Sequence, residues 1–340
     1  MSASQTQSID FDIIDLIKKQ ENIKSRLAAI EEVPASEDIN GEKQNKPKTP
    51  AINIEFSDEA KPYIPQSSTE YIAPPEMEEF NTLMHVDGPI LLTGPTGTGK
   101  TSMVREWCAI NNVPFFRVSC HPQMEASEFL GTNALVPDTK TGHLITKWQP
   151  SQTAMAIMYG GVLCIDEIFR SPILMAIQSL LEDKPSLSVQ DAHGLSKTRL
   201  EPKHWFKIVA TDNTTGIGGS DHYDAEAVDI STLDRFRAAL YIDYPTFDAD
   251  MAIGNKIATR LNEGQIEAIV HLVRAVREAH NTGTLPITAS VRCLINLIQL
   301  SEALEHVGKA YKVCLVNRVD AEYKPTLSNI YTQITGKTLD

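Results

Sequence analysis

Eight consecutive residues could bind the phosphates of a nucleotide. They are Gly94, Pro95, Thr96, Gly97, Thr98, Gly99, Lys100 and Thr101, and they match the pattern G-x-x-x-x-G-K-[ST] in full. Glycines at these positions let the backbone turn tightly and direct its N–H groups inward. The lysine is expected to reach the β- and γ-phosphates, and the threonine hydroxyl to reach Mg²⁺. The motif therefore predicts a site for ATP and Mg²⁺.

An acid pair further along the chain could complete the chemistry. Asp166 and Glu167 directly follow the apolar run Val162–Ile165. We expect Asp166 to hold Mg²⁺ through water, and Glu167 to act as the general base that activates the attacking water. An acid pair in this place favours hydrolysis of ATP over phosphoryl transfer to a bound acceptor, so a small-molecule kinase is the less expected class.

The elements around these motifs predict an α/β protein. The glycine-rich loop follows the apolar run Pro89–Thr93 and precedes a helical stretch from Thr101, which is the strand-loop-helix arrangement that phosphate binding requires. Further short apolar runs are Phe115–Ser119, Val162–Asp166, Phe206–Thr211 and Ala239–Asp243. Continuous apolarity suits strands that are buried on both faces of a parallel sheet. Beyond Phe247 the apolar residues recur at a helical period, so we expect a sheet domain over 76–246 and a helical domain over 247–340.

The N-terminal part has a different character. Ile9, Ile13, Leu16, Ile23, Leu27 and Ile30 form a heptad stripe within residues 1–33. A short coiled coil and a single amphipathic helix that packs on the main domain both fit this stripe. Residues 34–75 are polar, charged and proline-containing, which predicts a flexible linker. Within it, the alternation of Ile52, Ile54 and Phe56 suggests a short edge strand.

The bulk composition narrows the class of protein. The chain has 340 residues, 42% of them hydrophobic, and a formal net charge of -13. The acidity counts against a protein that holds nucleic acid mainly through phosphate contacts. The five cysteines include no C-x-x-C pair, which argues against a disulfide framework or a structural zinc site. Because the chain has no membrane-length apolar run and no signal-peptide pattern, we expect it in the cytoplasm.

Several segments together resemble one family. The stretch Gly160–Ile168 resembles the Walker B element of the MoxR/dynein-midasin branch of AAA+ ATPases. Within that branch it is similar to the CobS subunit of aerobic cobaltochelatase and to CobS-like proteins of phages. Ala210–Gly218, Thr232–Phe236 and Val316–Asp320 resemble later CobS segments in the same order. The resemblance implies a P-loop AAA+ parallel-sheet domain with β-hairpin insertions, followed by a small helical lid domain.

The resemblance also implies roles for further residues. Asn213 resembles sensor 1, which helps position the hydrolytic water. Arg235 resembles the arginine finger that reaches the γ-phosphate of the neighbouring subunit, and Arg237 is a second candidate. A surface ion pair is the alternative for both arginines. Arg292 resembles sensor 2 of the lid, although Val291 stands where the family often has proline.

Two segments resemble the insertions of this branch. Leu135–Lys147 contains a turn-like sequence and could be a hairpin within the second helix, and Leu187–Leu200 could be a hairpin before sensor 1. In related rings such hairpins face the pore or the client protein. An ordinary surface hairpin remains the alternative for each segment.

The resemblance implies a ring, expected to be a hexamer, that hydrolyses ATP and remodels or activates a partner protein. A protein with a von Willebrand A-type (metal-ion-dependent adhesion) domain is the expected kind of partner. One alternative is the ATPase subunit of a cobaltochelatase that drives cobalt insertion. Another is a nucleic-acid motor or packaging factor, against which the acidic charge counts.

Overall fold

The computed structural model describes residues 54–139, 141–171, 177–189, 199–214 and 230–339. The chain divides into two units, Met1–Pro50 and Ala51–Asp340, and the described residues belong to the second. The predicted N-terminal helix lies outside the described residues, so the choice between a coiled coil and a packed helix stays open.

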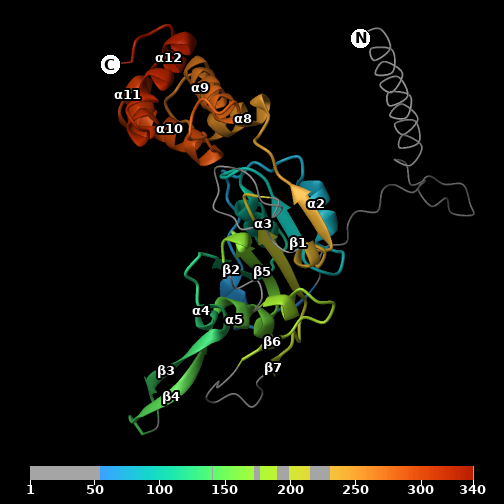
Figure 1. Ribbon diagram of the computed structural model, residues 1–340. Coiled ribbons are helices and arrows are strands. Elements are labelled where there is room, and N and C mark those ends of the chain that lie inside the picture. Colours follow the sequence, from blue (N-terminus) through green and yellow to red (C-terminus); the bar gives the residue numbers. More distant parts are fainter. Residues whose placement is uncertain (1–53, 140, 172–176, 190–198, 215–229, 340) are drawn as a thin grey trace, which may run out of the picture. The chain divides into compact units, whose positions relative to one another are not determined.

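A parallel five-stranded sheet forms the centre of the first half of this unit (Figure 1). Its strands are β1 (Ile90–Thr93), β2 (Phe115–Ser119), β5 (Gly161–Asp166), β8 (Phe206–Thr211) and β9 (Ala238–Tyr241), in the order β2-β5-β8-β1-β9. All neighbouring pairs in this order run parallel. The carboxyl ends of these strands therefore meet at one edge of the sheet, where the predicted site residues follow β1, β5 and β8.

Helices cover both faces of the sheet, and for this reason its strands read as continuous apolar runs. On one face, α2 (Met77–Leu83) and α3 (Lys100–Ile110) bury Phe80, Met103 and Trp107 against Leu92 and Val162. On the other face, α5 (Gln152–Tyr159) packs its alanines and Ile157 against alternate residues of the same strands. The predicted α/β fold is confirmed.

Two hairpins extend from this domain. The first joins β3 (Gly131–Pro137) to β4 (Leu144–Pro150) and lies between α4 (Ala126–Leu130) and α5, so it is longer than the predicted segment (Figure 1). The second begins and ends with the two-residue strands β6 (Leu187–Ser188) and β7 (Arg199–Leu200). The tip of the second hairpin, residues 190–198, lies outside the described residues.

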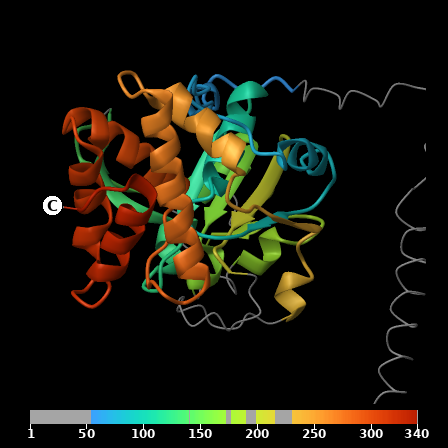
Figure 2. The same ribbon diagram turned by 90° about the horizontal axis from the view of Figure 1, so that it is seen from above.

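The second half of the unit is helical and has its own apolar core. Its helices are α8 (Phe247–Ile257), α9 (Glu263–Asn281), α10 (Val291–Ala303), α11 (Val307–Cys314) and α12 (Lys324–Thr335). They enclose one cluster of buried side chains. Figure 2 shows these helices, in orange and red, packed beside one another. Side-chain caps begin several of them: Asn262 and Gln265 form a capping box for α9, and Ser290 caps α10. Among the described residues, no helix combines the length and apolarity needed to cross a bilayer.

Residues 54–75 differ from the linker and edge strand that the sequence suggested. They contain a short 3-10 helix, η1 (Lys61–Tyr63), and no strand, and Phe56 and Ala60 are buried in the core beneath α2 and α3. Further along, the backbone N–H of Ser68 donates to Glu106 of α3 at 3.1 Å. Burial of Phe56 in the core keeps this segment on the domain, a tertiary contact that a short polar stretch of sequence does not reveal.

Candidate nucleotide site

At two positions of the loop after β1, other parts of the chain come so close that only glycine fits. Gly94 has φ +135, and a Cβ atom there would lie 2.0 Å from the carbonyl oxygen of Ile242. Gly97 has φ +71, and its Cβ would lie 2.3 Å from the Cβ of Ser290, which caps helix α10. A side chain at either position would be strained in conformation and would also clash. The helical domain therefore lies directly against the glycine-rich loop.

The Lys100 side chain lies along this loop and is buried. Its Nζ donates to the carbonyl oxygens of Gly94 at 2.7 Å and Pro95 at 2.8 Å, and to Oδ1 of Asn213 at 3.0 Å. Burial lowers the pKa of Lys100 to about 8, and the nearby carboxylates, led by Asp212, oppose this shift. The ammonium group is thus placed among acceptors at the loop where phosphates are expected.

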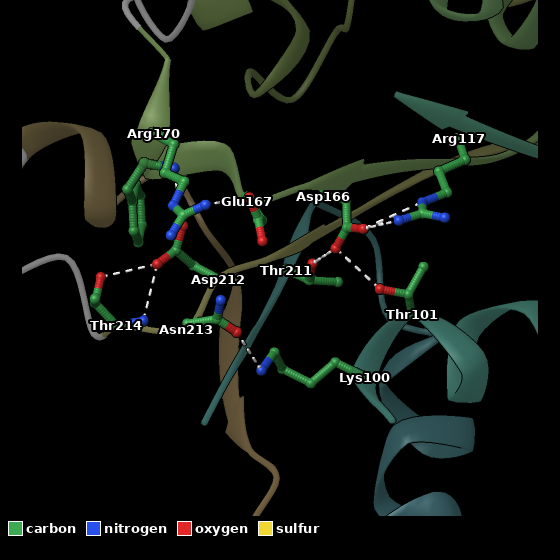
Figure 3. Close-up of polar contacts among 11 residues, drawn as sticks. Lys100, Thr101, Arg117, Asp166, Glu167, Arg170, Thr211, Asp212, Asn213 and Thr214 are labelled. Carbon is green, nitrogen blue, oxygen red and sulfur yellow. Dashed lines mark hydrogen bonds and ion pairs between the residues drawn. The ribbon is translucent and has the colours of Figure 1, made fainter. Parts of the chain in front are cut away.

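The carboxylate of Asp166, at the end of β5, receives four hydrogen bonds (Figure 3). Thr101 donates to Oδ1 at 2.9 Å, and Thr211 of β8 donates to the same oxygen. Arg117 of β2 donates to Oδ2 through Nε at 3.1 Å and also through Nη2. The Thr101 hydroxyl and the Asp166 carboxylate are hydrogen-bonded to each other, and both are oxygen ligands of the kind that Mg²⁺ prefers. Thr101 and Asp166 therefore fit a magnesium ion.

Glu167, directly after β5, adopts a left-handed backbone with φ 56. Non-glycine residues rarely do so, and strained backbone of this kind is found often at functional sites. The carboxylate of Glu167 accepts from Nη1 of Arg170 at 2.9 Å. Both side chains are partly exposed, so solvent weakens this ion pair at the edge of the site.

Asn213 and its neighbour Asp212 follow β8 and form hydrogen bonds with the other segments at the carboxyl edge of the sheet. Asn213 contacts Lys100, as described above. The buried Asp212 accepts from the backbone N–H of Phe169 at 3.0 Å and from that of Thr214 at 2.8 Å. It thereby joins the turn after β5 to the loop after β8. Lys100, Thr101, Asp166 and Asn213 thus form one connected group across β1, β5 and β8.

Arg235 and Arg237 lie apart from this group, between α7 (Ile230–Leu233) and β9. Nη1 of Arg235 lies 3.5 Å from Oε1 of Glu182, while Nε of Arg235 is buried and has no hydrogen-bond partner among the described residues. Nε of Arg237 donates to the carbonyl oxygen of Asp87 at 3.2 Å. An open cavity of about 700 Å³ is lined by both arginines and by Glu182. No hydrogen bond or ion pair within the described residues joins Arg235 to the group around Lys100.

Arg292 lies in the first turn of α10, and its side chain is exposed. The residue before it, Val291, donates its backbone N–H to the carbonyl oxygen of Gly97 at 3.1 Å. A second link to the loop comes from Tyr244, whose hydroxyl donates to the carbonyl oxygen of Thr96 at 3.0 Å. The first turn of α10 therefore begins at the phosphate loop, and Arg292 projects from that turn.

Three residues of this region were not expected from the sequence: Arg117, Arg170 and Thr211. A signal existed for Arg117, because it is a charged residue inside the otherwise apolar run Phe115–Ser119. Arg170 and Thr211 carry no comparable signal, since arginine after a strand and threonine at its end are both common.

Comparison with known proteins identifies the domain. The model of the AAA domain, dynein-related subfamily, matches residues 89–236. Denitrification regulatory protein NirQ of Pseudomonas aeruginosa is 29% identical over 226 residues, which cover 65% of this chain and 78% of NirQ. Protein NorQ of Paracoccus denitrificans is 25% identical over 278 residues, which cover 81% of this chain and 94% of NorQ.

Two further similarities complete the comparison. Midasin of Giardia intestinalis is 26% identical over 246 residues, and the chain matches only 5% of its length. The RuvB Holliday junction branch migration motor of Thermotoga maritima has 17% identity and a TM-score of 0.43, with 79% of this chain and 72% of that chain covered; at that score the likeness carries no argument. The finer resemblance to CobS stays a prediction. The complete phosphate loop, the acid pair and the match over residues 89–236 show that this chain carries an ATP-hydrolysing AAA domain of the dynein-related subfamily.

Proposed function

We propose that this chain is one protomer of a ring that binds ATP and Mg²⁺ between neighbouring protomers and uses hydrolysis to remodel or activate a partner protein. The observation that carries the proposal is the connected group of Lys100, Thr101, Asp166 and Asn213 at the carboxyl edge of the sheet. It places a cation for phosphates within hydrogen-bonding distance of an amide, and beside them a hydroxyl within hydrogen-bonding distance of a carboxylate.

In the proposed mechanism each residue has a distinct task. Backbone N–H groups of residues 94–101 and the N-terminus of α3 bind the phosphates, and Lys100 neutralises their charge. Thr101 and Asp166 would hold Mg²⁺, which supplies charge stabilisation for the transferred phosphoryl group. Glu167 takes the proton of the attacking water, and Asn213 orients that water.

Two arginines lie outside the connected group and are proposed to act on a bound nucleotide, one across the interface and one within its own protomer. Arg235 reaches the nucleotide of the neighbouring protomer, where such a charge can be worth about 10³-fold in rate. Arg292 approaches the nucleotide of its own protomer, because the helix that carries it begins at the phosphate loop. The proposal implies that an isolated protomer is nearly inactive and that a ring, by resemblance a hexamer, is the working form.

The role of Glu167 is tested by Glu167→Gln. This variant is expected to bind ATP with unchanged affinity and to lose turnover, because the amide cannot accept the proton. Glu201→Gln, which also removes the charge of an acid paired with an arginine but lies away from the site residues, is the matched control. Turnover by Glu167→Gln at the rate of the unmodified protein would show that another group is the base.

Action in trans is tested with mixed rings. Arg235→Ala and Lys100→Ala are each expected to be inactive alone. Mixed together, they should recover part of the activity, because some interfaces then join an intact phosphate loop to an intact arginine. Arg237→Ala, mixed in the same way, shows which of the two arginines acts. If no mixture recovers activity although mixed rings form, Arg235 does not act across the interface.

The first hairpin offers a contact for the proposed partner. Leu135 and Leu144 near its tip are 67% and 65% exposed, and Ile145 is 43% exposed. Apolar side chains gathered on a protruding hairpin are typical of a protein-binding surface. In related rings such hairpins face the pore or the client protein, so we propose that the partner contacts this hairpin.

Capture of the partner tests this role. The Glu167→Gln protein with ATP should retain a von Willebrand A-type protein from its source cells, because the ring is held in its ATP-bound form. The same protein with Leu135→Ser and Leu144→Ser should lose the partner and keep ATP binding. Equal capture by both proteins would rule out the hairpin as the binding surface. Capture without ATP would rule out a role driven by ATP.

A further inference from the structure

The guanidinium group of Arg117 donates hydrogen bonds to one carboxylate oxygen of Asp166, the residue that is expected to bind Mg²⁺. Both of its donors, Nε at 3.1 Å and Nη2, point to Oδ2 of Asp166, while Thr101 and Thr211 donate to Oδ1 (Figure 3). Every short contact to this carboxylate therefore comes from a donor of this chain. A divalent cation that approaches Oδ2 has to compete with a positive charge that is already there.

The fold explains how Arg117 reaches this place. Strand β2 pairs in parallel with β5, so that Arg117 lies beside Cys164 and Ser119 lies beside Asp166. Side chains alternate along a strand, and Arg117 stands on the exposed side between the buried Phe116 and Val118. A long side chain from that position can extend along the sheet edge to the carboxylate. The side chain of Arg117 is 51% exposed and that of Asp166 is 12% exposed, so the arginine is the partner that can move away.

We propose that Arg117 is a built-in counter-ion that couples the binding of Mg²⁺ to the binding of nucleotide. While Arg117 pairs with Asp166, it cancels a negative charge that would repel the phosphates. When Mg²⁺ takes its place beside Asp166, the guanidinium gives way at Oδ2. Arg117 acts through Asp166 and is thus a positioning residue. This inference rests on the proposed ATP–Mg²⁺ site.

The same contacts would also suit a purely structural link between β2 and β5. The two roles predict different results. A structural link, once removed, lowers stability and weakens nucleotide binding equally with and without metal. A counter-ion, once removed, weakens metal-free binding and leaves Asp166 more open to Mg²⁺. The quantity that separates them is the ratio of the nucleotide dissociation constant in EDTA to that in excess MgCl₂.

The experiment measures this ratio with a fluorescent ATP analogue in the Glu167→Gln background, where the nucleotide stays intact. Arg117→Gln is expected to raise the ratio by about fivefold or more, at the low end of typical coupling between two ligands. Arg117→Lys, which keeps the charge but loses the two-donor geometry, should raise it less. Arg105→Gln removes an exposed arginine of α3 and should leave the ratio unchanged.

An unchanged or lower ratio in Arg117→Gln would overturn the inference. If Arg117→Gln does not fold, Arg117→Lys provides the test. An unchanged ratio of dissociation constants in Arg117→Lys would show that the two-donor contact of Arg117 with Asp166 does not compete with Mg²⁺, and would also overturn the inference. A parent protein that binds the analogue in neither condition would instead refute the proposed nucleotide site. The two failures are therefore distinguishable.

Discussion

The buried carboxylate of Asp250 offers a sharp test of how the helical domain is held together. Asp250 is fully buried in α8 and accepts from Nη1 of Arg277 at 2.6 Å and from Nη2 at 3.3 Å. Arg277 also donates to the carbonyl oxygen of Ala289 at 2.7 Å, and its guanidinium lies 4.5 Å from the ring centre of Tyr244. Tyr244 in turn contacts the phosphate loop. The ion pair thus supports the side of the helical domain that lies against the nucleotide site.

Asp250→Ala removes the carboxylate and leaves the buried guanidinium without its counter-charge. Removal of one partner of a buried ion pair costs about 3–5 kcal/mol of folding free energy. The sheet and helical domains belong to one compact unit, Ala51–Asp340. For a unit well above about 100 residues, each kcal/mol shifts the unfolding midpoint by about 2–4 °C, so we expect a drop of about 10 °C. Thermal unfolding followed by circular dichroism measures this shift. Replacing the pair together, as Asp250→Leu with Arg277→Met, should recover much of the loss, because the only cation among the described residues left without Asp250 is then Arg274, whose side chain is 41% exposed to water.

Asp248→Ala is the matched control for this change. Asp248 also lies in the first turn of α8 but is exposed, so it shares the favourable interaction with the helix dipole and lacks the buried partner. Its replacement should shift the midpoint by about 2 °C or less, in line with surface substitutions of about 0.5 kcal/mol. Equal shifts for the two variants would refute the argument that the buried pair stabilises this domain.

Other perturbations have outcomes that the structure specifies. Because the pKa of Lys100 is about 8 before nucleotide binds and phosphates favour its charged form, ATP affinity should be constant below that pH and fall by up to about tenfold per pH unit above it; a flat titration from pH 7 to about 9 would contradict this assignment. Gly94→Ala would place a Cβ 2.0 Å from a backbone oxygen and should abolish nucleotide binding. Gly142→Ala, also at positive φ but in open space, should retain it; binding by both variants would show that the loop adapts. The thiols of Cys293 and Cys314 are buried 3.7 Å apart, so a thiol oxidant such as diamide should join them and lower the intact mass by about 2 Da. If the mass stays unchanged after prolonged treatment with the oxidant, α10 and α11 cannot bring the two sulfur atoms close enough to form a bond.

The sequence was sufficient for the phosphate loop, the acid pair and the strands. These features are local: glycines, lysine and threonine at fixed spacing, and apolar runs long enough to be buried on both faces of a sheet. Sequence also indicated the change to helices beyond Phe247, because the apolar period changes there. The first hairpin was expected from its turn residues, although its strands extend beyond the predicted ends.

The partners of the site residues depended on the tertiary structure. Arg117 meets Asp166 only because β2 and β5 are neighbours in the sheet, and Ser290 lies at Gly97 only because α10 begins at the phosphate loop. Likewise, residues 54–75 look like a linker in sequence but bury Phe56 in the core. Local patterns reveal which groups can bind phosphate and metal, since that chemistry depends on residue type and short spacing. Which charges face one another is decided by contacts between distant segments, and these have no signature in the order of residues along the chain.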